Sequence, residues 1–263
     1  MAIPTDMPAA LVLAGTRPGG DAFAQAQGAP HKALIELDGV PLLARVVEAL
    51  REAGVTRIAV SCDEERVAEL ARSLTCEIVA PGPGPSASVA AAFAAIGAPL
   101  IVTTSDHALL QGNWVRELVE RTPAEADLSV MLAERAVVEA AMPGTKRTYL
   151  RFADGAWSGC NLFYLRTPAA GLAIATWERV EADRKRPWRI AARLGPATLL
   201  AMALRRLTLA EGLARLGRRI GVTTRLVAAS DGLAAVDIDK QADLDAVRDL
   251  LRDAAAKPSA KLQ

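Results

Sequence analysis

The amino-acid sequence predicts an α/β fold: a Rossmann-like, doubly wound, mostly parallel sheet with a β-hairpin and a helical insertion on its substrate side. Three observations lead to this fold class. Short apolar runs alternate with helical patterns through the first half of the chain. The earliest run, residues 9–14, is apolar throughout, as in a strand buried on both faces. The 263 residues are 51% hydrophobic, which is enough to bury one sizeable core.

The alternation assigns each element up to residue 134. A helix begins at Pro41, carries apolar residues at helical spacing and ends before Gly54, so its start and stop signals agree. Ligands in such sheets lie beyond the carboxyl ends of the strands. The other elements predicted in this half are strands at 58–61, 77–80, 100–104 and 128–133 and helices at 64–74, 88–96 and 114–121.

The pattern changes in the second half. Two apolar runs, 149–152 and 161–165, flank a turn at Asp154-Gly155 and predict an antiparallel pair that forms a lid on the substrate side. Residues 168–217 are rich in Ala, Leu and Arg and predict a helical insertion.

We expect one domain over residues 1–255. Its last elements are predicted to be strands at 224–228 and 235–239 and a helix at 242–254, with a disordered tail at 256–263.

Composition excludes several classes of protein. Lys and Arg number 31 against 30 Asp and Glu, which gives no global charge for a nucleic-acid partner. Cys62, Cys76 and Cys160 are an odd number at spacings that match neither a zinc site nor a disulfide framework, so we expect reduced core residues. The first residues lack a signal-peptide pattern, and no apolar run reaches the roughly 18 residues of a membrane span. We therefore expect a cytoplasmic location.

The loop between the first strand and Lys32 is a candidate phosphate site. Glycines that expose backbone N–H groups can hold phosphate oxygens, and a lysine adds a mobile positive charge. The stretch is neither a Walker A loop nor GxGxxG, so an ordinary surface loop is the alternative.

Acidic residues at two later strand ends are candidate metal ligands. Asp106 follows the 100–104 strand, where an N-cap or Asx-turn is the alternative. Asp237 and Asp239 are two apart in a predicted strand and so face the same side. We favour Asp237 as the ligand, with Asp239 as the alternative N-cap of the last helix.

The order of these motifs resembles one known family. The strand LVLAG, a loop, Lys32-Ala33-Leu34 and then GVPLL resemble the signature of the MobA-like nucleotidyltransferases. That family includes molybdenum cofactor guanylyltransferase, methylerythritol phosphate cytidylyltransferases and sugar-phosphate nucleotidyltransferases. The chain departs from its pattern at Thr16, which replaces a second glycine, and in the length of the loop. The resemblance implies a Rossmann-like sheet with an inserted acceptor-binding part.

The resemblance also implies roles for individual residues. Lys32 and Arg17 become the catalytic cations, and Asp106 and Asp237 hold Mg²⁺ beside the nucleotide phosphates. The nucleotide base is implied to bind the segment 81–89. Its Ser-x-Ser-Val ending is closer to that of cytidylyltransferases and slightly favours CTP over GTP. The remaining nucleotide-binding residues implied are Leu13, Ala14, Gly15, Thr16, Pro81, Ser86 and Ser88.

The candidate acceptor-binding residues lie in the second half of the chain. Arg147, with its neighbours Lys146 and Tyr149, and Gly159 and Asn161 are candidates for binding a phosphorylated small-molecule or lipid-precursor acceptor. The basic, partly apolar stretch 184–219 suits either peripheral contact with an anionic membrane or a helical cap or homodimer interface with solvated arginines.

The predicted reaction is transfer of NMP from an NTP to the acceptor with release of pyrophosphate. Three alternatives stay open: a molybdenum cofactor guanylyltransferase using GTP, an NAD-dependent oxidoreductase, and a non-catalytic nucleotide-binding module.

Overall fold

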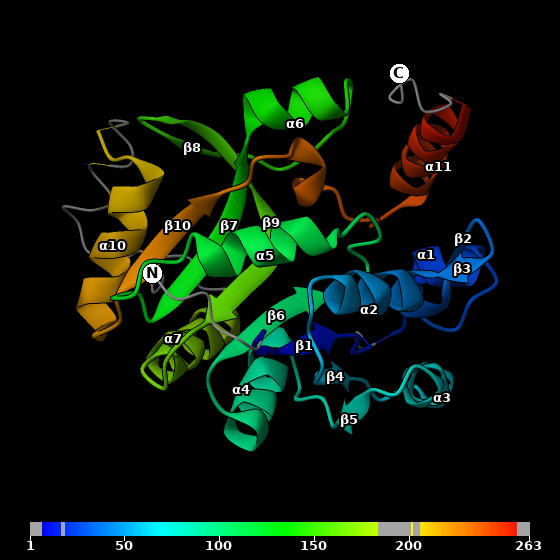
Figure 1. Ribbon diagram of the computed structural model, residues 1–263, viewed down its shortest axis with the longest axis horizontal. Coiled ribbons are helices and arrows are strands. Elements are labelled where there is room, and N and C mark those ends of the chain that lie inside the picture. The colour runs from blue at the N-terminus through cyan, green and yellow to red at the C-terminus, as the bar shows by residue number, and fades with distance from the viewer. Residues whose placement is uncertain (1–6, 17–18, 184–200, 202–205, 257–263) are drawn as a thin grey trace.

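The computed structural model describes residues 7–16, 19–183, 201 and 206–256. Its centre is an eight-stranded, mostly parallel sheet (Figure 1), which confirms the predicted fold class. The strands are β1 (Ala9–Leu13), β4 (Ile58–Ser61), β5 (Glu77–Val79), β6 (Leu100–Thr104), β7 (Leu128–Glu134), β8 (Leu150–Phe152), β9 (Gly155–Leu165) and β10 (Thr224–Ala228). A small ladder of β2 (Glu36–Leu37) and β3 (Val40–Pro41) stands apart.

The strand order locates the ligand crevice. It runs β10-β7-β9-β6-β1-β4-β5, with β8 paired to β9. The chain proceeds from β1 to β4 and β5 on one side and then crosses to β6 on the other side of β1, so the order reverses at β1. A reversal of this kind opens a crevice beyond the carboxyl ends of the two diverging strands. The switch point therefore lies at the ends of β1 and β6.

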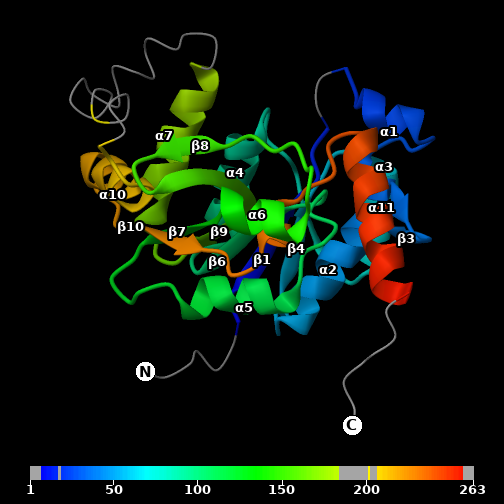
Figure 2. The ribbon, with the colours of Figure 1, turned by 90° about the horizontal axis from the view of Figure 1, so that it is seen from above.

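Helices cover both faces of the sheet (Figure 2). β1 shows why: Ala10 and Val12 are buried with α2 and α5, whereas Leu11 is buried on the opposite face with α4 and α7. All three β1 side chains are fully buried, as the unbroken apolar run predicted. The helices are α1 (Ala22–Ala26), α2 (Leu42–Glu52), α3 (Glu65–Ser73), α4 (Pro85–Ile96), α5 (Gly112–Glu120), α6 (Arg135–Ala141), α7 (Ala170–Ala182), α10 (Leu209–Ile220) and α11 (Gln241–Ala256).

Two element predictions are wrong. The segment 235–239 is no strand: its first residue ends a 3-10 turn, η2 (Gly232–Ala235), and Ile238 donates its N–H to the Asp106 carbonyl at 3.1 Å. Its alternating apolar residues are buried by packing and not by a sheet ladder. The predicted partner strand 161–165 is the end of a long β9 that lies between β6 and β7, while β8 pairs only with the start of β9.

Part of the predicted insertion, residues 184–200 and 202–205, and the end of the tail, 257–263, lie outside the described residues. In the parts that are described, no helix is both long and apolar enough to cross a membrane.

Candidate functional site

The loop after β1 starts at the switch point and is fixed there by its neighbours. Ala14 donates its N–H to the Ser61 carbonyl at 2.9 Å, and the Leu13 carbonyl accepts from Ser105 N at 3.0 Å. The main chain of these two predicted nucleotide-binding residues thus joins β1 to the ends of β4 and β6. Gly15 and Thr16, which follow, are exposed at the edge of the sheet.

His31 closes this loop from its far end. Its Nδ1 accepts a hydrogen bond from Ala33 N at 3.0 Å, so its Nε2 carries the proton and faces the Gly15 carbonyl at 3.4 Å. The imidazole is buried. It therefore has a structural role, holding Lys32 at the start of η1 (Lys32–Leu34) close to Gly15.

Thr16 is held by an acidic residue from the next strand along the sheet. Asp63, just beyond β4, accepts hydrogen bonds on one oxygen, Oδ1, from the Thr16 N–H at 3.0 Å and the Thr16 hydroxyl at 2.8 Å. The residue that replaces the family's second glycine is therefore ordered by a side chain. Arg17, the second predicted cation, lies outside the described residues.

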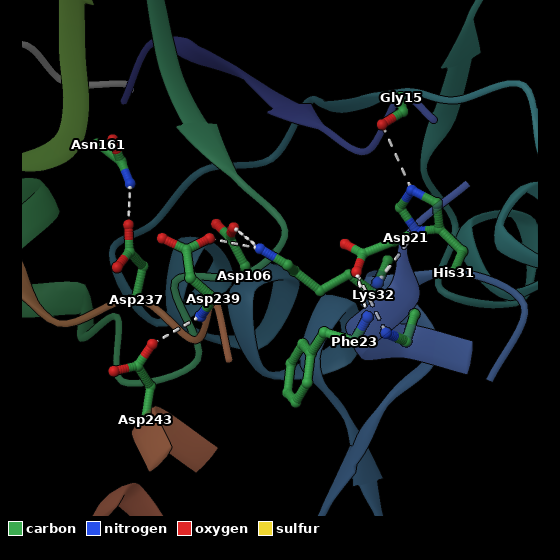
Figure 3. A network of polar contacts seen from close by, with 12 residues as sticks. Gly15, Asp21, Phe23, His31, Lys32, Asp106, Asn161, Asp237, Asp239 and Asp243 are labelled. Carbon is green, nitrogen blue, oxygen red and sulfur yellow. Dashed lines mark hydrogen bonds and ion pairs between the residues drawn. The ribbon is translucent and has the colours of Figure 1, made fainter. Parts of the chain in front are cut away.

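Lys32 reaches from the end of the loop to two carboxylates (Figure 3). Its Nζ lies 2.9 Å from Asp106 Oδ2 and 2.6 Å from Asp239 Oδ1, and its side chain is only 12% exposed. Burial lowers the pKa of Lys32, but the two carboxylates outweigh burial and hold the pKa above its ordinary value. Lys32 is thus a charged group at neutral pH.

The two acidic segments are joined through their backbones. Asp106 follows β6, and its carbonyl accepts the Ile238 N–H described above, which places Asp239 beside it. The Asp239 N–H in turn binds Asp243 Oδ2 at 3.1 Å, at the start of α11. On Asp106, Oδ1 is buried and has no hydrogen-bond partner among the described residues.

Asp237 is bound by the predicted acceptor residues. Arg147 pairs with its Oδ1 and also donates to its carbonyl at 3.1 Å, while Asn161 Nδ2 donates to Oδ2 at 2.8 Å. Asn161 has a left-handed φ of +48°. Burial raises the pKa of Asp237 above its ordinary value, although Arg147 opposes the shift. Gly159, the third predicted acceptor residue, pairs with Leu132 in the β7–β9 ladder.

The predicted base-binding segment lies beside the β1 loop. A Cβ on Gly15 would stand 3.6 Å from the Pro81 side chain. Ser88 Oγ accepts from Gly82 N at 3.0 Å and donates to the Gly84 carbonyl at 2.9 Å, and the Ser86 hydroxyl donates to Glu181. Both hydroxyls are buried and used inside the protein. The expectation that they read a base edge is therefore not supported.

Comparison with known proteins decides the family. The family model of the MobA-like NTP transferase domain matches residues 10–219. The chain belongs to the MobA-like NTP transferase family. A structure described as a hypothetical transferase from Thermus thermophilus is 33% identical, with a TM-score of 0.78, over 90% of this chain and 99% of that one.

Two further solved structures share the fold. CMP:2-keto-3-deoxy-manno-octonic acid synthetase complexed with CTP is 18% identical, with a TM-score of 0.58, over 94% of this chain and 100% of that one. The 2-C-methyl-D-erythritol 4-phosphate cytidylyltransferase of Thermus thermophilus is 15% identical, with a TM-score of 0.52, over 94% and 100%. The chain is thus a nucleotidyltransferase in fold and family.

The acidic residues of this NTP transferase suit a divalent cation only in part. Within the described ranges, no three His, Cys, Asp or Glu side chains form a group that could hold a metal ion unaided. Asp106 and Asp239, however, already converge on one cation, the Lys32 ammonium, and Asp106 Oδ1 has no partner in the described part of the chain. Mg²⁺ is typically held by one or two carboxylates together with substrate phosphates. The pair fits that pattern.

Sequence reasoning missed two residues of this transferase. Asp63 lies two positions beyond a buried strand, and the rule that ligands gather at carboxyl ends of strands would have found it. Glu181, on α7, contacts the predicted base-binding segment from 95 residues away, and no local pattern marks it.

Proposed function

We propose that this NTP transferase transfers CMP from CTP to a phosphorylated small-molecule or lipid-precursor acceptor and releases pyrophosphate. The convergence of Lys32, Asp106 and Asp239 at the ends of β1 and β6 carries the proposal. Two fold neighbours whose descriptions name CTP or a cytidylyl group support CTP as the first donor to test. GTP is the alternative donor.

The reaction needs positioning and charge neutralisation more than covalent chemistry. An acceptor phosphate oxygen attacks the α-phosphorus, the bond from that phosphorus to the bridging oxygen breaks, and the electron pair leaves with pyrophosphate. A phosphate monoester is already an anion at neutral pH, so no general base is required. Lys32 exchanges its carboxylate partners for phosphate oxygens and neutralises the charge that develops on them. The exposed backbone at Gly15 and Thr16 borders the same phosphates.

Mg²⁺ is the proposed cofactor, and it would supply charge neutralisation at the phosphates. Asp106 and Asp239 are the residues that would hold it. This assignment replaces Asp237, because both carboxylate oxygens of Asp237 already accept hydrogen bonds from Arg147 and Asn161. Asp239 and Asp106 instead present oxygens to a single cation.

The acceptor is proposed to bind on the Asp237 side of the site. Figure 3 shows Asn161 and Asp237 on the far side of Asp239 from the Lys32 chain. Arg147, whose guanidinium is bound to Asp237, supplies the cation for an anionic acceptor there.

Pyrophosphate release tests this function. The purified protein is assayed with each of the four NTPs, Mg²⁺ and a panel of sugar phosphates and polyol phosphates. We expect release with CTP that Lys32→Ala and Asp106→Ala abolish. Arg72→Ala, which removes a cation from an exposed ion pair on α3, should retain full activity. Turnover that survives both site substitutions would overturn the mechanism.

A further inference from the structure

Glu181 closes the amino end of α4 from another helix. Its Oε2 accepts a hydrogen bond from the Ser86 N–H at 3.2 Å and a second one from the Ser86 hydroxyl. The side chain comes from the last turn of α7, which packs along α4 on the same face of the sheet (Figure 2). The carboxylate also interacts favourably with the positive end of the α4 dipole.

Gly84 makes room for this carboxylate. It is the N-cap residue of α4 and forms no side-chain cap. A Cβ at this position would clash with Glu181 Oε1 and stand 3.0 Å from its Cδ. N-cap positions favour Ser, Thr, Asp or Asn, so glycine here leaves space that Glu181 fills. The second oxygen, Oε1, therefore lies beside Gly84, at the end of the 81–84 loop.

That loop borders the nucleotide site on the side opposite the acidic cluster. A Cβ added to Gly15 would meet the Pro81 side chain at 3.6 Å, and the loop follows β5, on the β4–β5 side of the switch point. With the phosphates at Lys32 and Gly15, we place the base on the side of the crevice away from Asp106 and Asp239. The 81–84 loop is the neighbouring wall, and the two serine hydroxyls behind it are already used internally.

We propose that Glu181 determines base specificity by accepting a hydrogen bond from an exocyclic amine of the base. A carboxylate only accepts, so it matches the N4 amine of cytosine or the N2 amine of guanine. The carboxylate repels the O4 carbonyl of uracil, which stands in place of the cytosine amine, because both groups are hydrogen-bond acceptors. This inference rests on the proposed function, because it requires a nucleotide in the crevice.

Equilibrium binding of nucleotides tests the inference without an acceptor. CTP and UTP, and GTP and ITP, are titrated with Mg²⁺ into wild type and Glu181→Gln. ITP is GTP without its exocyclic amine. The Gln amide oxygen can still accept from Ser86, which turns its NH₂ group toward the base. We expect the preference for the amine-bearing nucleotide of the better-bound pair to fall about tenfold in Glu181→Gln, the effect of one charged hydrogen bond.

A second variant separates base recognition from helix capping. In the double variant Gly84→Ser with Glu181→Ala, the serine at the N-cap position replaces Glu181 as the group that caps α4. We expect this double variant to regain the thermal stability lost by Glu181→Ala while its base preference stays reduced. If the variant remains unstable, Glu181→Gln decides alone, because the amide keeps the cap.

The outcomes distinguish this inference from the proposed function. If the wild type binds none of the four nucleotides, the proposed function fails and the inference fails with it. If the wild type binds them and Glu181→Gln leaves the CTP to UTP and GTP to ITP ratios unchanged, Glu181 is only a helix cap. In that case the nucleotidyltransferase proposal stands.

Discussion

The ammonium of Lys32 donates a hydrogen bond to Asp106 Oδ2 at 2.9 Å, across 74 residues of sequence. The contact joins the end of the β1 loop to the end of β6, the two strands at which the strand order reverses. Without nucleotide, the cation that we propose to bind phosphate is neutralised by the carboxylates that we propose to bind Mg²⁺. In the proposed mechanism, binding of nucleotide and Mg²⁺ is therefore an exchange of partners within one site.

Asp106→Asn should lower the rate of pyrophosphate release by at least about 100-fold, since it removes a carboxylate that we propose to hold the Mg²⁺ that neutralises the phosphates. The measurement is the initial rate with CTP at saturating Mg²⁺. Asp249→Asn, at an exposed position on α11, is the matched control and should be unaffected. A wild-type rate in Asp106→Asn would remove this residue from the mechanism.

Arg147→Met should destabilise the fold because it leaves the carboxylate of Asp237 buried without its cationic partner. The two side chains are only 10% and 15% exposed. Removing one partner of a buried pair costs about 3 kcal/mol in the free energy of unfolding. Urea denaturation measures this change.

The double variant Arg147→Met with Asp237→Asn serves as its control. It should regain much of the lost stability, because no uncompensated charge remains buried. Equal stability of Arg147→Met and wild type would mean that the pair contributes nothing.

Because His107 is buried, we predict that the protein loses folding stability in mild acid. Burial against Trp114 lowers the pKa of His107 to about 4, although the Asp106 charge opposes the shift. The folded protein therefore binds fewer protons at this group than the unfolded chain, whose imidazole has a pKa near 6.5. The stabilisation is complete above pH 6.5 and is lost as the pH falls toward 4, amounting to about 3 kcal/mol.

Urea denaturation of the metal-free protein at pH 7 and pH 4.5 measures that loss. His107→Gln cannot take up the proton, so its stability should fall less over the same interval. Parallel pH profiles for the two proteins would show that His107 does not titrate in this way.

The three cysteines should resist alkylation in the folded protein. All are free and buried, and burial together with the nearby Asp63 charge raises the pKa of Cys62 to about 11. Burial likewise raises the pKa of Cys76 and of Cys160. Since only the thiolate reacts, iodoacetamide at pH 8 should label them in guanidinium and not in buffer. Rapid labelling of Cys62 in buffer would contradict its burial.

The elements that could be predicted from the sequence are those whose buried apolar side chains recur at a regular helix or strand spacing. The unbroken apolar run of β1 and the helical spacing from Leu42 both appear in the structure as expected. The segment 235–239 was misread because its alternation has the strand period. Ala235, Val236 and Ile238 are buried by contacts with other elements, and the segment bonds to Asp106 instead of to a strand.

The site was predictable only where a residue follows directly from a strand end or a family motif. Lys32 and Asp106 lie at such positions, and the structure brings them together. The choice between Asp237 and Asp239 depends on Arg147 and Asn161, which lie 90 and 76 residues from Asp237 in the chain. Glu181 contacts Ser86 through the packing of α7 on α4. Tertiary contacts of this kind leave no periodic or local pattern.

The central claim is that nucleotide phosphates bind at Lys32. Calorimetric titration of CTP, with GTP as the alternative donor, into wild type and Lys32→Ala in the presence of Mg²⁺ tests it without an acceptor. Removing a charged partner of the phosphates should weaken binding at least about tenfold. Equal dissociation constants for wild type and Lys32→Ala would place the phosphates elsewhere and contradict the account.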